Sequence, residues 1–365
     1  MIILLSIIII LGVAIFFFMQ QSKFGKAPSG DRLEKIKASA HYKDGTFENL
    51  SYTSTLTGDG SYAKALWEFL FVKKERLRPV DSIPSVKTDL LHLDINENVL
   101  VWFGHSSYFM QIDGKRILVD PVFSGAASPV SFAVKSFNGT DIYTTDDIPE
   151  IDYLFISHDH WDHLDYETVV KLKSKVKTVI CGLGVGEHFE YWGYDKDIIV
   201  EKDWNESASL GDGFSVHFTP ERHFSGRTLR RNISVWTSFV LRTPTMQVFI
   251  GGDSGYDTHF SEIGKTFGSF DLVILENGQY DEKWANIHMM PHEVLQAAKE
   301  LNGKRLFPVH SSKFTLANHA WDEPLKKITE LNEVTKQSMI TPMIGEPVNL
   351  SDTAQTFSKW WVGLE

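Results

Sequence analysis

Short apolar runs that end in a turn or a polar residue recur through the middle of the chain. They are Val99–Phe103, Ile117–Val119, Tyr153–Ile156, Val176–Ile180, Phe214–Phe218, Val248–Ile250, Leu272–Leu275 and Leu306–Val309. Runs of this length are typical of strands, and Asp113-Gly114 predicts a hairpin turn between two of them. Asp165–Lys173 and Pro291–Asn302 predict helices between strands. This alternation predicts a layered α/β domain whose functional site lies at the strand ends.

The first segment has a different pattern. Ile2 to Met19 is apolar except for Ser6 and Gly12 and carries no charge. Eighteen helical residues span about 27 Å, close to the thickness of a bilayer core. A cleaved signal peptide and a buried core helix are the alternatives, but no basic residue precedes the run and no polar stripe crosses it. We therefore predict a single-pass anchor in the cell membrane at residues 1–22.

The residues after this segment bear on the orientation of the protein and on the start of its body. Lys23 and Lys26 follow the apolar run directly. By the positive-inside rule they predict that the body lies on the cytoplasmic side of the membrane. Residues 23–95 are rich in turns, and Tyr62–Glu75 has the pattern of an amphipathic helix. We expect its aromatic residues, Trp67 and Phe71 among them, to pack on the body.

Composition and charge remove several classes of function. The chain has 365 residues, with 36 Lys and Arg against 47 Asp and Glu, which gives a formal net charge of −11. This balance argues against a general nucleic-acid binder, which needs basic surface. The single cysteine, Cys181, excludes a disulfide framework and a Cys-rich zinc module. A metal site in this chain must therefore use carboxylates and some of its 14 histidines.

The densest group of such side chains follows the predicted strand Tyr153–Ile156. It has the pattern H-x-H-x-D-H and consists of His158, His160, Asp162 and His163. Two histidines two positions apart on an extended strand end project to the same side. Imidazole and carboxylate are the ligands that zinc takes when thiolates are absent.

Three further candidate ligands follow later strands in the same local context: His223, Asp253 and His310. Each of them alone is more often a structural or turn residue. Seven nitrogen and oxygen ligands shared between two ions would leave open positions for a water and a substrate. The joint pattern therefore predicts a metal site with two ions.

The order H-x-H-x-D-H, His, Asp, His resembles the metallo-β-lactamase fold hydrolases, which form an αββα sandwich with a dinuclear zinc site. The resemblance implies one zinc ion on His158, His160 and His223, a second on Asp162, His163 and His310, and a bridging Asp253. Further motifs are similar to the branch that contains N-acyl-phosphatidylethanolamine-hydrolysing phospholipase D and its bacterial relatives: Trp102–Ser107, Ile117–Ser124, Gly182–Gly186 and Gly251–Tyr256. The chain departs from many relatives at Ser311–Phe314, where they carry Trp-Gly-x-Phe.

The resemblance also implies a mechanism. Two zinc ions lower the pKa of a bridging water, and the metal-bound hydroxide attacks a phosphorus or an acyl carbon. Asp162 is a ligand that could also orient this water. His288 and His105 are the candidate proton donors for the leaving group, although His105 fits equally well as a residue that hydrogen-bonds a metal ligand.

A basic cluster surrounds His223 in the sequence. It consists of Arg222, Arg227, Arg230 and Arg231. Guanidinium groups match the geometry of phosphate oxygens, so we expect this cluster to recognise a phosphorylated head group. A solvated loop or structural ion pairs are the alternative for each arginine.

These observations predict a membrane-anchored, zinc-dependent phosphodiesterase of phospholipase D type that acts on N-acyl-phosphatidylethanolamine-like lipids. A lactonase or another small-molecule (phospho)ester hydrolase is the first alternative, and a metal-binding sensor or scaffold with low turnover is the second. The expected partners are a membrane and a phospholipid or phosphorylated small molecule, without nucleic acid, and the oligomeric state stays open. We expect the anchor at 1–22, an extension packing on the body at 23–95, the hydrolase domain at 96–350 and a tail at 351–365.

Overall fold

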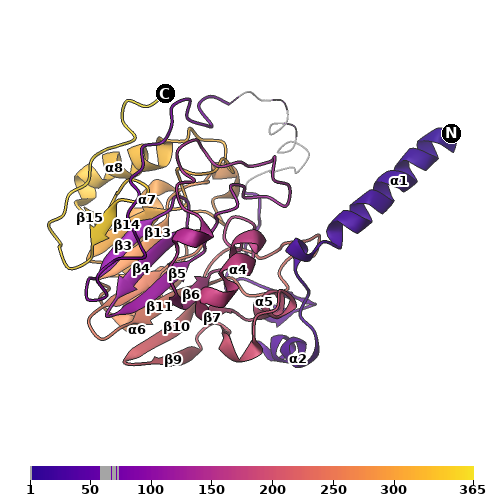
Figure 1. Ribbon diagram of the computed structural model, residues 1–365, viewed down its shortest axis with the longest axis horizontal. Helices are drawn as coiled ribbons and strands as arrows, with labels where there is room; N and C mark the ends of the chain where they lie inside the picture. The colour runs from indigo at the N-terminus through magenta and orange to yellow at the C-terminus, as the bar shows by residue number, and fades with distance from the viewer. Residues whose placement is uncertain (1, 58–66, 68–70, 72–73) are drawn as a thin grey trace.

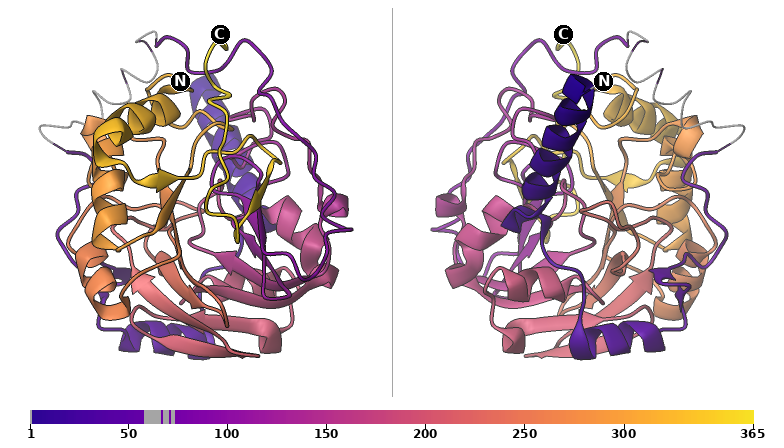
Figure 2. Two further views of the ribbon diagram at one scale, coloured as in Figure 1. Left: turned by 90° about the vertical axis from the view of Figure 1, so that its left-hand side faces the viewer. Right: turned by 90° about the vertical axis from the view of Figure 1, so that its right-hand side faces the viewer.

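Two β-sheets lie face to face, and helices cover both outer faces (Figures 1 and 2). The computed structural model describes residues 2–57, 67, 71 and 74–365. All eight predicted strands are present within two residues of their expected limits, for example β3 (Val99–Trp102). The α/β architecture with αββα layers, predicted from the sequence, is therefore confirmed.

The first sheet contains seven strands among the described residues, in the order β16-β3-β4-β5-β6-β7-β8. Their bounds are β3 (Val99–Trp102), β4 (Tyr108–Ile112), β5 (Lys115–Val119), β6 (Ile151–Ile156), β7 (Val176–Gly182), β8 (Ile199–Lys202) and β16 (Pro347–Asn349). Pairing is antiparallel from β16 to β5 and parallel from β5 to β8. The predicted hairpin turn joins β4 to β5, where Asp113 and Gly114 both have positive φ, at 49° and 75°.

The second sheet has the same plan, with the order β15-β14-β13-β12-β11-β10-β9. Its strands are β9 (Ser207–Gly211), β10 (Phe214–Pro220), β11 (Thr237–Arg242), β12 (Gln247–Ile250), β13 (Leu272–Glu276), β14 (Arg305–Val309) and β15 (Ser338–Met339). β9 to β12 pair antiparallel, and β12 to β15 pair parallel. In each sheet the parallel strands therefore end on the same edge.

The outer helices fall into two groups, one on each sheet (Figure 2). Their bounds are α4 (Tyr166–Leu172), α5 (Gly186–Tyr191), α6 (His259–Phe267), α7 (Pro291–Glu300) and α8 (Glu323–Thr335). Helices α4 and α5 pack on the first sheet, and α6, α7 and α8 pack on the second. The two helices predicted from the sequence are α4 and α7. The sequence analysis did not predict α5, α6 and α8.

The main hydrophobic core lies between the two sheets. Its aromatic side chains meet edge to face across the interface, with the Phe155 and Phe239 ring centroids 5.0 Å apart. Trp360 and Trp361, from the C-terminal segment, are buried in the same core. Burying large aromatic side chains is worth several kcal/mol each in a folded protein. The last residues of the chain thus contribute to the stability of the sandwich.

Part of the described chain before β3 packs on the body of the protein. Helix α2 (Gly30–Ala38) and a small hairpin of β1 (Tyr42–Lys43) and β2 (Thr46–Phe47) lie at one end of the sandwich (Figure 1). Ile36 and Phe47 are buried there against Trp236. The predicted helix Tyr62–Glu75 falls mostly outside the described residues. Of its aromatic residues, Trp67 and Phe71 are exposed, so the expectation that these two pack on the body is wrong.

Helix α1 (Ile2–Met19) projects away from the sandwich (Figure 1). Its apolar side chains are exposed from Ile3 to Phe17. The helix has 18 residues. Within the described part of the chain, no helix has both the length and the apolar character needed to cross a membrane. The helical prediction is confirmed, and the prediction of a membrane-spanning anchor at residues 1–22 finds no support.

Candidate metal centre

The loop after β6 carries the predicted ligand motif, and local hydrogen bonds fix its shape. The carbonyl of His160 accepts the backbone N–H groups of His163 and Leu164, at 3.1 and 2.8 Å. Helix α4 then begins with Asp165 as its N-cap, whose side chain accepts from the backbone N–H of Glu167. This turn directs the side chains of the motif inward, at the edge where the parallel strands end.

Three histidines converge at one end of the centre. His158 Nε2 lies 2.9 Å from His160 Nδ1, and His223 Nε2 lies 3.3 Å from the same atom. His223 Nδ1 lies 2.9 Å from the carbonyl of Ile287, to which it donates, so its Nε2 lone pair faces the other two rings. Nitrogen lone pairs brought this close favour a cation between them. This group therefore has the chemistry and the spacing of a metal site.

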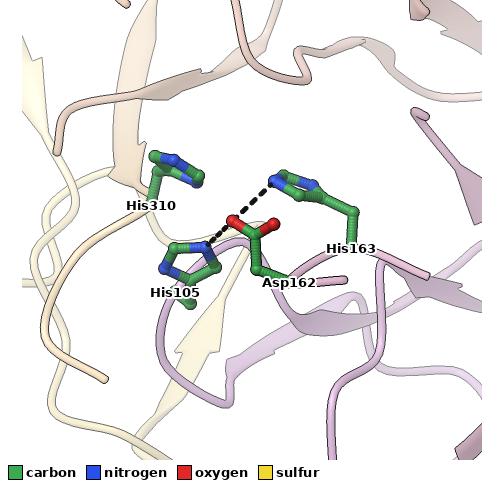
Figure 3. Close-up of side chains that lie close together, drawn as sticks. All are labelled: His105, Asp162, His163 and His310. Carbon is green, nitrogen blue, oxygen red and sulfur yellow. Dashed lines mark hydrogen bonds and ion pairs between the residues drawn. The ribbon is translucent and has the colours of Figure 1, made fainter. Parts of the chain in front are cut away.

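A second group adjoins the first (Figure 3). The Asp162 carboxylate lies between the imidazoles of His105 and His163, with Oδ2 at 2.8 Å from His105 Nε2 and 3.5 Å from His163 Nε2. His310 lies beside them, and its ring centroid is 4.1 Å from that of His105. The structure thus brings together the three predicted ligands of a second ion and adds His105 to them.

Asp253 lies between the two groups. Its carboxylate oxygens are 3.2 Å from His163 Nε2, 3.1 Å from His310 Nδ1 and 3.8 Å from His223 Nε2. Asp253 Oδ1 and His163 Nε2 are buried, yet neither makes a hydrogen bond with a described residue. Buried polar atoms without partners are costly, and cations between them would satisfy both. The donor set therefore fits metal ions, with Asp253 where a bridging ligand is expected.

Burial sets the protonation of the imidazoles. It lowers the pKa of His158, His223 and His310 well below the usual range, and it lowers the pKa of His160 to about 4. These four rings are therefore neutral at neutral pH, the form that binds metal. His163 differs, because the effect of burial is outweighed by the Asp253, Asp162 and Asp120 carboxylates, which raise its pKa. A proton must leave this ring when a cation binds.

Asp120, which the sequence analysis did not select as a site residue, supports the motif. Its Oδ2 lies 2.8 Å from His163 Nδ1, and its two oxygens accept from the backbone N–H and the hydroxyl of Ser157 at 2.9 and 2.6 Å. A carboxylate in this position fixes the orientation of a ligand imidazole and raises its basicity. Asp120 follows β5 directly, the same strand-end context that revealed the other candidates.

His288 is held by a second carboxylate that the sequence analysis also missed. Its Nδ1 lies 2.6 Å from Glu276 Oε2, and Glu276 Oε1 accepts the backbone N–H of Met289 at 2.8 Å. Glu276 is the last residue of β13 and is fully buried. The pair leaves His288 Nε2 directed away from Glu276, and His288 lines the cavity described next.

A cavity of about 310 Å³ opens at the centre. His160, His223 and Asp253 form part of its polar lining. Its apolar side is formed by Leu56, Phe224, Trp284, Ile287 and Leu316. The cavity therefore presents a polar, metal-binding region next to an apolar wall, to which the N-terminal extension contributes.

The four arginines predicted to bind substrate do not line this cavity. Arg227 is buried and donates to backbone carbonyl groups of the metal loop. Arg222 donates to two backbone carbonyl groups and a threonine hydroxyl. Arg230 and Arg231 lie on an exposed stretch of the same loop. Arg227 turns inward because its donors satisfy carbonyl groups that the irregular loop leaves unpaired, so the predicted phosphate contact finds no support for this residue.

The departure at Ser311–Phe314 has a structural counterpart. Lys313 is buried, and its ammonium group donates to the carbonyls of Phe103 and Val122 at 3.2 and 3.0 Å. Asp141 lies 3.5 Å from the same nitrogen. These three partners account for the three hydrogens of the ammonium group. Lys313 therefore joins loops behind the centre and is not part of the cavity wall.

Asn49, from the N-terminal extension, holds His223 in place. Its Oδ1 accepts the His223 backbone N–H at 3.0 Å, and its Nδ2 donates to the His223 carbonyl at 2.8 Å. We expect Asn49→Ala to weaken metal binding by up to about 30-fold, because two hydrogen bonds of about 1 kcal/mol each are lost. Zinc titration against a chelator measures the effect. Asn96→Ala, at an exposed turn, is the control, and equal affinities for the two variants would contradict this role.

Comparison with known proteins agrees with this geometry. The family model described as a beta-lactamase superfamily domain matches residues 115–311. An uncharacterized protein of Mycobacterium tuberculosis is 36% identical over 328 residues, which cover 88% of this chain and 87% of that protein. The N-acyl-phosphatidylethanolamine-hydrolyzing phospholipase D 1 of Caenorhabditis elegans is 26% identical over 269 residues, 69% of this chain and 75% of that protein.

A solved structure shows the same fold. Igni18, a metallo hydrolase from Ignicoccus hospitalis, aligns with a TM-score of 0.54 at 18% identity over 69% of this chain and 98% of that chain. The layered architecture is therefore the metallo-β-lactamase fold. The chain belongs to the beta-lactamase superfamily. It is a metal-dependent hydrolase of that superfamily.

Proposed function

We propose that the protein is a zinc-dependent phosphodiesterase of phospholipase D type that acts on N-acyl-phosphatidylethanolamine-like lipids. The observation that carries the proposal is the cavity, which combines two metal-binding groups with an apolar wall. A phosphodiester with acyl chains has a charged centre beside apolar chains and matches both parts. The similarity to the C. elegans phospholipase D supports the same substrate class.

The proposed metal ligands form two sets with one shared residue. His158, His160 and His223 would hold one zinc ion, Asp162, His163 and His310 would hold the second, and Asp253 would contact both. Bound zinc supplies Lewis acidity and lowers the pKa of coordinated water. The protein's own carboxylates and backbone groups orient the imidazoles before any ion binds, which reduces the cost of assembling the site.

His288 is the proposed proton donor for the leaving alkoxide. Glu276 fixes its ring through Nδ1, and the ring lines the cavity beside Asp253. His105 has a different role in this proposal. It is fully buried, bonds the Asp162 carboxylate through Nε2 and does not line the cavity, so it orients a ligand and does not reach substrate.

We further propose that α1 attaches the protein to a membrane surface. The exposed apolar side chains of this helix, followed by Lys23 and Lys26, support the proposal. Apolar side chains transfer favourably from water into a membrane, and basic residues at the end of the helix fit anionic head groups. An enzyme held at that surface meets lipid substrates at a high local concentration.

The test is metal analysis of the full chain combined with a hydrolysis screen. We expect about two zinc ions per chain and turnover of N-acyl-phosphatidylethanolamine that is faster in vesicles than in detergent micelles. Lactones, simple phosphodiesters and phosphate monoesters are the competing substrates. Turnover of lactones alone would replace the proposal with its first alternative. A chain that binds zinc and hydrolyses none of these substrates would favour a sensor or scaffold.

A further inference from the structure

The segment Ser22–Lys26, which Gln20 and Gln21 separate from α1, is docked against the loop that carries the metal ligands. The indole N–H of Trp192 donates to the Ser22 carbonyl at 2.7 Å. Phe24 is buried and meets Trp161 edge to face, with ring centroids 5.2 Å apart. Trp161 stands between His160 and Asp162 in the chain. The segment Ser22–Lys26 therefore packs directly on the metal loop.

Arg227 joins this segment to both ends of the loop. Its Nη1 donates to the carbonyls of Asp159 and Leu164, while its Nε and Nη2 donate to the Lys23 carbonyl at 3.2 and 2.9 Å. The guanidinium carbon lies 4.0 Å from the centre of the Trp161 ring. Each of these hydrogen bonds ends on a backbone carbonyl. One side chain thus fixes the backbone of the metal loop relative to the segment.

His188 makes a second connection. Its Nδ1 accepts the Lys26 backbone N–H at 3.1 Å, so its Nε2 carries the hydrogen and lies 3.3 Å from Asp159 Oδ2. Asp159 stands between His158 and His160 in the chain and is fully buried.

Asp159 extends the connection to the loop of the third histidine. Its Oδ1 accepts the backbone N–H of Gly226 at 2.6 Å, three residues after His223. Asp159 therefore links all three ligands of the three-histidine group to His188. Through Lys26 it links them to the segment Ser22–Lys26.

We propose that docking of the segment Ser22–Lys26 positions the three-histidine group and thereby sets its metal affinity. The inference rests on the proposed zinc binding of His158, His160 and His223. Because only Gln20 and Gln21 separate the segment from α1, attachment of that helix to a surface is coupled to the metal affinity of the three-histidine group. His188 and Arg227 act in this scheme as positioning residues that touch neither substrate nor metal.

Gly25 offers a way to disturb the docking from outside the metal loop. A Cβ atom at Gly25 would lie 2.0 Å from His188 Nδ1, and the residue has φ of +71°. Gly45 is a matched control, since it has φ of +89° and no atom within 4 Å of an added Cβ. Both replacements place an alanine at a positive φ, but only the first pushes on His188.

Zinc affinity, measured on the full chain by competition with a chelator, is the readout. We expect Gly25→Ala to bind zinc about tenfold more weakly at its tighter site, as for residues that orient metal ligands, and Gly45→Ala to remain within about twofold of the natural chain. His188→Leu is a second variant in case Gly25→Ala fails to fold. His188→Gln can donate to Asp159 and accept from Lys26, so it should restore most of the affinity that His188→Leu loses.

The outcomes separate this inference from the proposed function. If Gly25→Ala and His188→Leu both bind zinc as tightly as the natural chain and only their melting temperature is lower, the segment contributes to stability and not to zinc affinity. This result would overturn the inference and leave the proposed function intact. A natural chain that binds no zinc would overturn the metal centre on which it rests. If His188→Leu loses zinc affinity and His188→Gln does not recover it, the hydrogen bonds of residue 188 to Asp159 and Lys26 are not the cause. This result would also overturn the inference.

Discussion

Replacing His158 and His160 together with alanine is expected to remove at least one metal ion per chain and to lower kcat/KM at least about 1,000-fold. The change leaves His223 as the last member of a group whose nitrogens converge within 3.3 Å. One imidazole cannot hold an ion that three would share. A factor of 1,000 corresponds to about 4 kcal/mol of transition-state stabilisation, well within what metal ions supply. Metal content and kcat/KM on the same preparation measure the effect.

The folded state should tolerate this double variant. The alanines remove nitrogen atoms that face one another without an ion, so the loss of packing is partly offset. His92→Ala is the matched control, because His92 is exposed and pairs with the exposed Asp89. Activity of the double variant within tenfold of the natural chain, at unchanged metal content, would show that the three-histidine group is not part of the catalytic centre.

The strand-end pattern predicted the fold and the ligand set because both depend on the same physics. A buried strand must be apolar, and the residue directly after it is free to be polar. Asp253 and His310 therefore stand out at the ends of β12 and β14. The parallel part of each sheet directs these ends to one edge, so residues far apart in the sequence converge there. The ligand roles themselves stay predictions until metal is measured.

The strand-end pattern also applies to two residues that the sequence analysis did not select. Asp120 and Glu276 also stand at strand ends, and both prove to hold histidines of the centre. They were passed over because neither belongs to a histidine-rich motif. Asn49 is different, since it lies 174 positions before His223 in an irregular segment. No periodicity or motif connects two such residues, and only the packing of the extension brings them together.

The arginines that lie near His223 in the sequence do not line the cavity, although the sequence analysis predicted that they bind substrate. Arg227 lies four positions after His223, yet its guanidinium group faces the backbone of the metal loop. An irregular loop leaves carbonyl groups unpaired, and a buried arginine with five donors satisfies several of them at once. The direction of a side chain in a loop depends on which backbone carbonyl groups lie unpaired near it. A sequence pattern does not show which groups these are. For the first segment, the predicted apolar helix is present as α1, whereas the predicted membrane span finds no support among the described residues.

Replacing Asp120 with asparagine is expected to weaken metal binding about 10- to 100-fold while the fold is retained. The Asp120 carboxylate lies 2.8 Å from His163 Nδ1, and it is one of the charges that raise the pKa of that ring. The amide keeps the size of the side chain and can still accept from the Ser157 backbone, but it loses the negative charge that makes His163 a stronger ligand. Asparagine also tolerates the positive φ of 41° at this position. A change in zinc affinity can therefore be assigned to the lost charge and not to backbone strain. Chelator competition with zinc and kcat/KM measure the effect.

Asp113→Asn is the control for this change. Asp113 has a similar φ of 49° and is hydrogen-bonded to Thr243 and Thr245 at the β4–β5 turn, far from the centre. Both variants exchange a hydrogen-bonded carboxylate for an amide at a left-handed position. A general cost of that exchange would lower the melting temperature of both variants and leave zinc affinity unchanged. We expect only Asp120→Asn to lose zinc affinity, and equal affinities in the two variants would mean that the Asp120 carboxylate does not support the ligand His163.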